Sequence, residues 1–158
     1  MTEKAQETTS EVRRLTPDDL DAAVAIDRAI VGDPRRGYFE KRLAAALRQP
    51  RAHLQFGIDG PDGLEACVFA RVLSGEFGRE QESVLLEVIN VAPERQGTGA
   101  GGRLLAALEA EMRRRDIVEL QTSIQWTDHE LVRFFAANGF AKAPRHVIQC
   151  SVAQADVL

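Results

Sequence analysis

A short segment near the middle of the chain places four glycines within six positions, from Gly97 to Gly102, directly before an amphipathic run. Glycines there let the backbone point its N–H groups at one spot, and they leave room for an anion to approach the main chain. When such a loop opens a helix, the free N–H groups of the first turn and the helix dipole add to the attraction for negative charge. The segment therefore predicts a binding site for a phosphorylated ligand.

Two familiar phosphate-binding loops fit this segment poorly. A P-loop requires Lys followed by Ser or Thr after its last glycine, whereas Arg103 and Leu104 follow Gly102 here. The dinucleotide fingerprint Gly-x-Gly-x-x-Gly matches literally from Gly97, and Glu119 lies at about the right distance for a ribose contact. That fold needs several more strand–helix units after the loop, but only 56 residues follow Gly102. A nicotinamide-dependent dehydrogenase is therefore kept only as the remotest alternative.

The composition predicts one domain with a buried hydrophobic core. The chain has 158 residues, 44% of them hydrophobic, and we expect a single domain over residues 11–158 after a disordered polar leader at 1–10. A net charge of −4 and a pI near 5.4 disfavour nucleic acid as a partner. The sequence has no signal-peptide pattern and no apolar run of membrane length, so we expect a cytoplasmic protein without a membrane partner.

The few residue types that bind metals or form disulfides are scattered. Cys67 and Cys150 lie far apart, which indicates a reducing compartment and ordinary buried thiols, Cys150 as a small core residue. The three histidines lack the spacing of metal ligands, so no metal is expected.

The pattern of apolar residues and turn signals predicts a mixed α/β fold. Strands are expected at residues 11–15, 53–58, 64–73, 83–91, 117–124 and 146–152. The second to fourth of these are close in sequence and predict an antiparallel meander. Helices are expected after the cap Thr16-Pro17, over residues 38–48, after the glycines, and over residues 129–138, where Asp128 is the cap and Gly139 the stop.

Two segments together resemble a known family. The run VAPERQGTGAGGRLL, residues 91–105, resembles the acyl-CoA-binding motif of the GNAT superfamily of N-acetyltransferases, whose core appears here as Gln96, Gly99 and Gly101. The run RFFAANGF, residues 133–140, is similar to the second family signature, an aromatic-rich helix that ends in Gly-Phe. The resemblance implies a mostly antiparallel central sheet with a splayed central strand pair, flanked by about four helices.

The resemblance also implies how acetyl-CoA, the acyl donor, would be held. Residues 96–102 are called the glycine loop below, and their backbone N–H groups would hold the pyrophosphate. The main chain at the strand end, Asn90 and Val91, would pair with the pantetheine arm. The residues assigned to the coenzyme are Asn90, Val91, Gln96, Gly97, Thr98, Gly99, Ala100, Gly101, Gly102, Asp128 and Phe135. Asp128 stands where relatives often have Asn, and helix capping also explains it.

Acyl transfer to an amine needs a neutral nucleophile and stabilisation of the oxyanion. Glu87 interrupts an apolar run two pleat steps before Val91, and is expected on the same face as Val91. Two interpretations stay open: Glu87 is a general base whose pKa is raised by burial, or it is a carboxylate held in a salt bridge. By resemblance, the main-chain N–H of Val91 would be the oxyanion donor. Tyr38, the only tyrosine, is a further candidate for the catalytic or acceptor site.

The general acid is where the chain departs from the family pattern. Many relatives have a tyrosine that protonates the CoA sulfur at the position occupied here by Phe135. Three alternatives follow from Phe135. The CoA thiolate leaves unprotonated, another residue donates the proton, or the protein binds acyl-CoA with little catalysis. The sequence thus predicts an acyl-CoA-dependent N-acetyltransferase acting on a primary amine of a small molecule or protein, with a non-catalytic acyl-CoA-binding regulatory module as the alternative. The acidic surface mildly favours basic acceptors, and a homodimer is plausible for this fold.

Overall fold

The computed structural model describes residues 11–152, whose contacts group into two units, one ending at Ser123 and the other beginning at Ile124. Each unit is described by itself. The expected leader at residues 1–10 lies outside the described residues.

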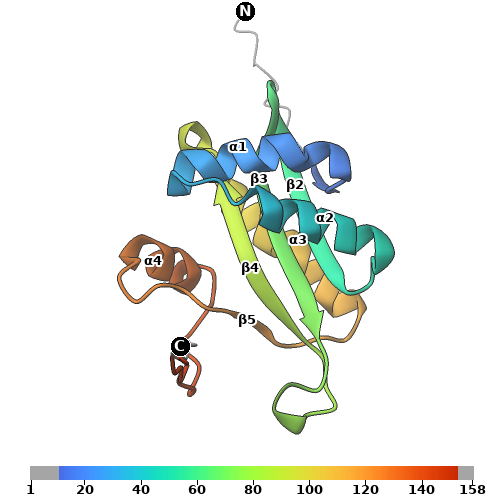
Figure 1. The fold of residues 1–158 in the computed structure, drawn as a ribbon, viewed down its shortest axis with the longest axis vertical. Coiled ribbons are helices and arrows are strands. Elements are labelled where there is room, and N and C mark those ends of the chain that lie inside the picture. The colour runs from blue at the N-terminus through green and yellow to red at the C-terminus, as the bar shows by residue number, and fades with distance from the viewer. Residues whose placement is uncertain (1–10, 153–158) are drawn as a thin grey trace, which may run out of the picture. The chain divides into compact units, whose positions relative to one another are not determined.

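A five-stranded sheet runs through the first unit, with its strands side by side in chain order (Figure 1). The strands are β1 (Val12–Arg14), β2 (His53–Gly60), β3 (Gly63–Leu73), β4 (Ser83–Val91) and β5 (Leu120–Thr122). The first four are antiparallel, which confirms the predicted meander, and β5 joins β4 in parallel. A dinucleotide-binding fold is built on a mainly parallel sheet, so this topology argues against the dehydrogenase alternative.

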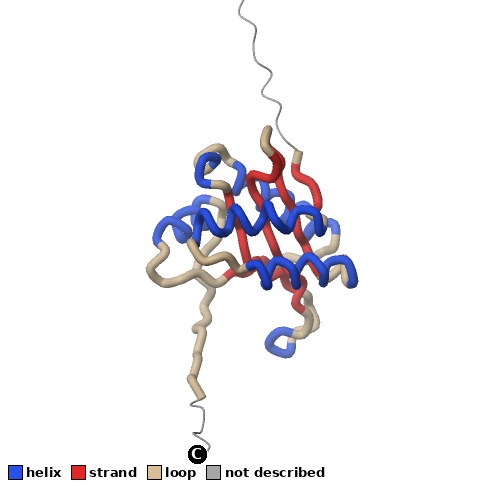
Figure 2. The backbone as a smooth tube through the Cα atoms, turned by 45° about the horizontal axis from the view of Figure 1, so that its top comes forward, coloured by secondary structure: helices blue, strands red, loops and turns tan. Residues whose placement is uncertain are grey.

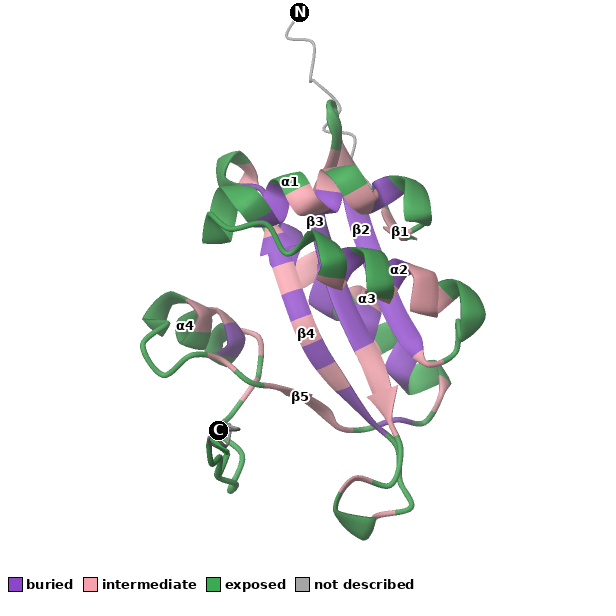
Figure 3. Cartoon of the chain, viewed as in Figure 1, coloured by how far each residue is buried: buried purple, intermediate pink, exposed green. Residues whose placement is uncertain are grey.

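Helices cover both faces of this sheet. On one face lie α1 (Leu20–Val31) and α2 (Arg36–Arg48), and on the other lies α3 (Ala100–Arg114), the crossover that a parallel strand pair requires (Figure 2). The core under α1 and α2 consists of Ala23, Phe39, Leu43, Cys67, Phe69 and Val88. The buried stripe of α3 consists of Leu104, Leu105, Leu108 and Met112. Figure 3 shows buried residues concentrated on β2, β3 and β4, between these two layers.

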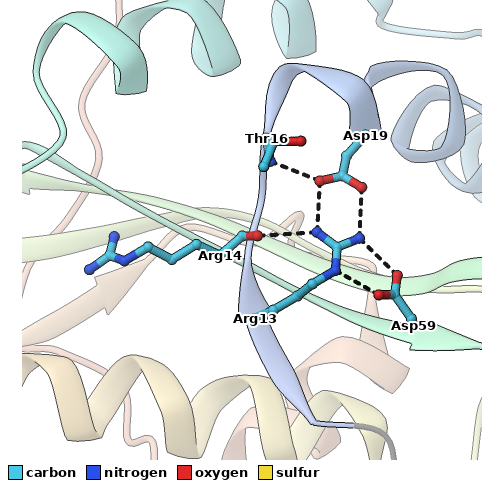
Figure 4. A network of polar contacts seen from close by, with 5 residues as sticks. All are labelled: Arg13, Arg14, Thr16, Asp19 and Asp59. Carbon is cyan, nitrogen blue, oxygen red and sulfur yellow. Dashed lines mark hydrogen bonds and ion pairs between the residues drawn. The ribbon is translucent and has the colours of Figure 1, made fainter.

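The start of α1 differs from the expectation of one helix capped by Thr16. A 3₁₀ turn, η1 (Pro17–Asp19), precedes α1, and the Asp19 carboxylate accepts a hydrogen bond from the Thr16 N–H at 2.8 Å. Arg13 of β1 reaches both this carboxylate and Asp59 at the end of β2 (Figure 4). These bonds from Arg13 hold the pKa of Asp19 below its usual range against the opposing effect of burial. The network fixes the entry of α1 to the β1–β2 edge of the sheet.

Two of the predicted strands differ from the structure: one is shorter than expected, and the other is not formed. The strand expected at residues 117–124 shortens to β5, because only residues 120–122 pair in register with β4, and Val118 is exposed. The strand expected at residues 146–152 is absent from the described part of the second unit. Its apolar residues Val147 and Ile148 are exposed, and Cys150 is exposed rather than buried.

The second unit contains α4 (His129–Ala137), and its ends follow the sequence signals. The Asp128 carboxylate accepts a hydrogen bond from the Leu131 N–H at 3.0 Å, so Asp128 is the N-cap as predicted. Gly139 has φ +87°, a left-handed conformation that ends the helix. Among residues 11–152, no helix is long and apolar enough to span a membrane.

Candidate active site

The glycine loop joins β4 to α3 and is shaped by two glycines in a left-handed conformation. After the short turn η3 (Pro93–Arg95), Gly97 has φ +80° and Gly99 has φ +86°. Residues with a Cβ rarely adopt such angles, so glycine is required at both positions. Nothing lies within 4 Å of where a Cβ on either would be, so backbone conformation, rather than crowding, is the reason.

The loop presents free donors where the sequence predicts an anion site. The first bond of α3 runs from the Arg103 N–H to the Gly99 carbonyl at 3.1 Å. The N–H groups of Ala100, Gly101 and Gly102 therefore have no acceptor within the helix and stand at its positive end. Thr98 tightens the loop by donating from its hydroxyl to the Arg95 carbonyl at 2.6 Å.

Gln96 faces back into the loop rather than toward a ligand. Its side-chain amide donates to the Val91 carbonyl at 3.2 Å, and its N–H reaches the Pro93 carbonyl at 3.5 Å. Gln96 thus fixes the loop to the end of β4, while the available N–H groups come from the residues after it.

Beyond residue 86, one edge of β4 has no strand partner among the described residues. The strand β5 pairs with β4 only at residues 84–86, and the Thr122 hydroxyl makes the last contact, to the Leu86 carbonyl at 2.9 Å. The next five residues of β4 form an open edge, which is the splayed strand pair expected from the sequence.

The register decides which residues present backbone groups at this open edge. The Ala92 N–H donates to the Glu65 carbonyl of the β3 side at 2.8 Å. Because directions alternate along an antiparallel ladder, Asn90 also bonds toward β3, whereas Ile89 and Val91 point their N–H and C=O groups to the open edge. From the sequence, Asn90 and Val91 are expected to pair through their main chain with the pantetheine arm. In the observed register, the residues whose main-chain groups face the open edge are Ile89 and Val91.

A β-bulge interrupts β4 at Glu87. On β3, Phe69 lies opposite Val88 and Ala70 lies opposite Leu86, so Glu87 is an extra residue with no partner. As a result both Glu87 and Val88 face α1 and α2: Val88 packs into that core, and Glu87 bonds to α2.

The bulge also corrects the expected position of Glu87 relative to Val91. The Asn90 side chain donates to Asp27 of α1 at 2.9 Å, so Asn90 shares the α1–α2 face with Glu87. Val91, one residue further along the strand, faces the opposite side of the sheet. The expectation that Glu87 and Val91 share a face is therefore wrong.

Glu87 is held by three donors from two neighbouring elements. The Tyr38 hydroxyl donates to Oε2 at 2.7 Å, while Arg42 and Arg71 donate to Oε1 at 2.7 and 2.8 Å. The Glu87 side chain is 13% exposed. This Glu87 cluster, defined as Tyr38, Arg42, Arg71 and Glu87, agrees with the interpretation of a carboxylate held in salt bridges.

The environment of Tyr38 keeps its hydroxyl protonated. Burial raises the pKa of Tyr38 well above its usual range, and the hydrogen bond to the Glu87 carboxylate raises it further. The Arg42 guanidinium lies 5.3 Å from the centre of the Tyr38 ring, a cation–π distance. Tyr38 therefore acts as a hydrogen-bond donor to Glu87 across the physiological pH range.

A second buried carboxylate lies on the same face of the sheet. Asp27 of α1 is fully buried and accepts from Arg35 at 2.5 and 3.0 Å, in addition to the Asn90 amide. Burial alone would raise the pKa of Asp27, but the bonds from Arg35 and Asn90 outweigh it and hold the pKa below its usual range. Asp27 is thus compensated and offers no free charge to a cationic ligand.

The site residues expected in the second unit lie on α4. Phe135 is buried, with its ring centre 5.2 Å from that of Phe134 and 4.8 Å from that of Phe140. The ring of Phe135 therefore belongs to the packing of α4 and the segment after it.

Sequence reasoning missed the two arginines that bind Glu87. A signal was present for Arg71, which interrupts the apolar run of β3 as Glu87 interrupts that of β4. Opposite charges in adjacent apolar strands commonly pair across the sheet. Among residues 11–152, no group of three or more His, Cys, Asp or Glu side chains is arranged to hold a metal ion.

Solved structures define the fold class of the protein as that of GNAT acetyltransferases. The chain is similar to the aminoglycoside N-acetyltransferase AAC(6')-Iy in complex with CoA, at 14% identity and TM-score 0.78, covering 96% of this chain and 100% of that chain. It is similar to a ribosomal-protein-alanine N-acetyltransferase from Brucella melitensis biovar Abortus 2308, at 17% identity and TM-score 0.68, covering 89% and 98%. It is also similar to a transcriptional regulator from Bacillus halodurans C-125, at 13% identity and TM-score 0.74, covering 90% and 99%.

The family assignment comes from the sequence itself. The profile described as the acetyltransferase (GNAT) family matches residues 24–140, which span both signature segments. The chain belongs to the GNAT acetyltransferase family. A comparison with curated proteins gave no match.

Proposed function

We propose that the protein transfers an acetyl group from acetyl-CoA directly to a primary amine of a small molecule or protein. The observation that carries this proposal is the junction of the open β4 edge with the glycine loop, where an extended arm and a pyrophosphate would bind in series. Membership of the family and the CoA held by a structural neighbour support it. The reaction needs no metal and no covalent enzyme intermediate.

Coenzyme binding would use main-chain groups almost entirely. The pyrophosphate would accept from the N–H groups that follow Gln96, at the positive end of α3. The pantetheine arm would pair with Ile89 and Val91 as an added strand. Asp128 and Phe135 are proposed as further coenzyme contacts from the second unit, although the Asp128 carboxylate already caps α4.

In the chemical step, the amine nitrogen attacks the thioester carbonyl carbon, the C–N bond forms and the C–S bond breaks. The negative charge that develops on the carbonyl oxygen would be stabilised by the Val91 N–H at the open edge. The CoA thiolate would leave unprotonated, which is tolerable because thiols have a pKa of about 8.5.

Glu87 and Tyr38 would act at the acceptor side. Three of the roughly four hydrogen-bond positions of the Glu87 carboxylate are occupied, which leaves one on Oε2. We propose that Glu87 takes up the amine proton at this position, through a water. Tyr38 would hold Glu87 in place rather than protonate the leaving sulfur.

The test is calorimetric titration of the full chain with acetyl-CoA, with NAD and NADP as controls. Micromolar binding of acetyl-CoA with no heat from the dinucleotides is expected. Absence of acetyl-CoA binding, or binding of a dinucleotide, would overturn the assignment of the loop. Formation of a homodimer and a cytoplasmic location stay predictions; sedimentation of the purified protein checks the first.

A second candidate function is a non-catalytic acyl-CoA-binding or regulatory module, which Phe135 favours. Phe135→Tyr separates the two candidates, because it supplies a hydroxyl at the position of the family tyrosine. A gain in turnover of a few-fold is expected for an enzyme that works without a general acid. Acetyl-CoA binding without turnover of any amine, in either variant, would support the binding module instead.

A further inference from the structure

The Glu87 cluster carries an excess positive charge. Arg42 and Arg71 share one oxygen of the Glu87 carboxylate, and within residues 11–152 neither has a second carboxylate partner. The neighbouring pair of Asp27 and Arg35 is neutral as a whole. Two guanidinium groups and one carboxylate therefore give the Glu87 cluster a net charge of +1, in a protein whose net charge is −4.

The two arginines also have N–H donors without an acceptor in the part of the chain that the structure describes. Arg71 binds Glu87 through Nε alone, so among residues 11–152 neither of its terminal nitrogens has an acceptor, and its side chain is 40% exposed. Arg42 donates to Glu87 from one terminal nitrogen, while its buried Nε has no acceptor. Unpaired buried donors carry a free-energy cost, which a ligand that accepts hydrogen bonds can relieve.

The position of the cluster places these donors beside the proposed reaction. Glu87 directly follows Leu86, the last residue of β4 in contact with β5, so the cluster begins where the open edge begins. An amine that approaches a thioester on this edge from the α2 face would pass the cluster.

We propose that the acceptor is an amine that also carries a carboxylate, bound by the free terminal nitrogens of Arg71 with the charge of Arg42 behind them. This inference rests on the proposed function. A guanidinium binds a carboxylate through two parallel charge-assisted hydrogen bonds, a geometry that also fixes the orientation of the attached amine. The acidic composition of the whole chain suggested basic acceptors, but the local charge has the opposite sign.

The same charge assists the reaction. A nearby positive charge disfavours the ammonium form of the acceptor and lowers its pKa, so more of the bound amine is neutral and nucleophilic. A polycationic acceptor would be repelled instead.

The experiment compares acceptors that differ only in the carboxylate. The affinity for acetyl-CoA is measured first by calorimetry; if acetyl-CoA does not bind, the proposed function fails and this inference falls with it. Release of CoA thiol is then followed with free amino acids, the same amino acids as C-terminal amides, their decarboxylated amines, and kanamycin as a polycation. We expect kcat/KM for the acids to exceed that for the amides by about tenfold or more.

Variants of Arg71 test whether this residue is the cause. Arg71→Gln should remove the preference for acids over amides through a higher KM, with the Kd of acetyl-CoA unchanged, while Glu87 keeps Arg42 and Tyr38. Arg71→Lys should keep part of the preference, because the charge remains and the two-pronged geometry is lost. Arg113→Gln, which removes an equal charge from the last turn of α3, is the matched control and should leave the preference intact.

Three results would overturn the inference while leaving coenzyme binding intact. The first is that amides, decarboxylated amines or kanamycin are turned over as fast as the free amino acids, or faster. The second is an unchanged acid preference in Arg71→Gln. The third is that acetyl-CoA binds but no acid in the panel is acetylated.

Discussion

The glycine loop and the Glu87 cluster lie at the two ends of the open β4 edge and are built by opposite means. The loop is one continuous segment whose N–H groups are aimed by backbone conformation, with positive φ at Gly97 and Gly99. The cluster consists of side chains from α2, β3 and β4, brought together by the fold and by a bulge at Glu87.

This difference suggests that the glycine loop and the Glu87 cluster have different functions. A backbone site is suited to the part of a ligand that never changes, because its donors are main-chain N–H groups and only the glycines that set their direction are required. A side-chain site can be altered by single substitutions without disturbing the loop. We therefore expect the loop to determine coenzyme affinity and the cluster to determine rate, acceptor choice and pH dependence.

The largest effect is expected in the loop, from Gly99→Asp or Gly101→Asp. Asp adds negative charge beside the pyrophosphate, and at Gly99 it also strains a backbone with φ +86°. We expect acetyl-CoA affinity to fall by more than about 100-fold, measured by calorimetry. Gly63→Asp, at a left-handed glycine in the β2–β3 turn, is the matched control and should bind normally. Unchanged affinity in both loop variants would remove the basis for the comparison.

The next effect concerns the charge at the centre of the cluster. Glu87→Gln leaves Arg42 and Arg71 without their carboxylate, so we expect unfolding free energy to fall by about 1–3 kcal/mol in denaturant titrations. Turnover should fall and its pH profile should shift, while the Kd of acetyl-CoA stays the same. Asp21→Asn, which breaks the exposed pair with Arg36, should cost clearly less stability. An unaltered rate in Glu87→Gln would make Glu87 purely structural.

A smaller effect is expected on acid stability. The pKa of Asp27 is below its unfolded value of about 3.9, so the stability it contributes is present above that pH and is lost as pH falls through the lowered value. Asp27→Asn should therefore reduce stability at neutral pH and flatten the decline below about pH 4, as followed by denaturation at a series of pH values. A decline as steep as in the parent protein would mean that other carboxylates cause it.

The smallest effect is expected from the loss of a side chain in the loop. Thr98→Ala removes the hydroxyl bond to the Arg95 carbonyl but no backbone donor. Calorimetry should show only a few-fold weaker binding of acetyl-CoA. A loss as large as that in Gly99→Asp would show that side chains, rather than the backbone, determine the affinity of the loop.

The sequence predicted what depends on local signals. Glycine spacing indicated the loop, apolar runs separated by short turns indicated the meander, and Asp128 with Gly139 marked the ends of α4. The Glu87 contacts were inaccessible because they join residues 49, 45 and 16 positions apart, and because a bulge leaves no trace in the apolar pattern. The strand expected at residues 146–152 was predicted from its own composition, but a strand also needs a neighbour with a free edge, which composition does not report.

The order of strands in the sheet has a consequence for how the chain folds. Each antiparallel pair joins strands that follow one another along the chain, so the first four strands and the two helices on one face of the sheet are complete by residue 91. Only the parallel β4–β5 pair needs residues that follow β4, and closing its crossover through α3 carries its own entropic cost. During synthesis, in which domains fold from the N-terminus, the four residues of the Glu87 cluster leave the ribosome before the glycine loop does. The proposed acceptor side is therefore the earlier half to assemble, and the glycine loop forms after the first four strands.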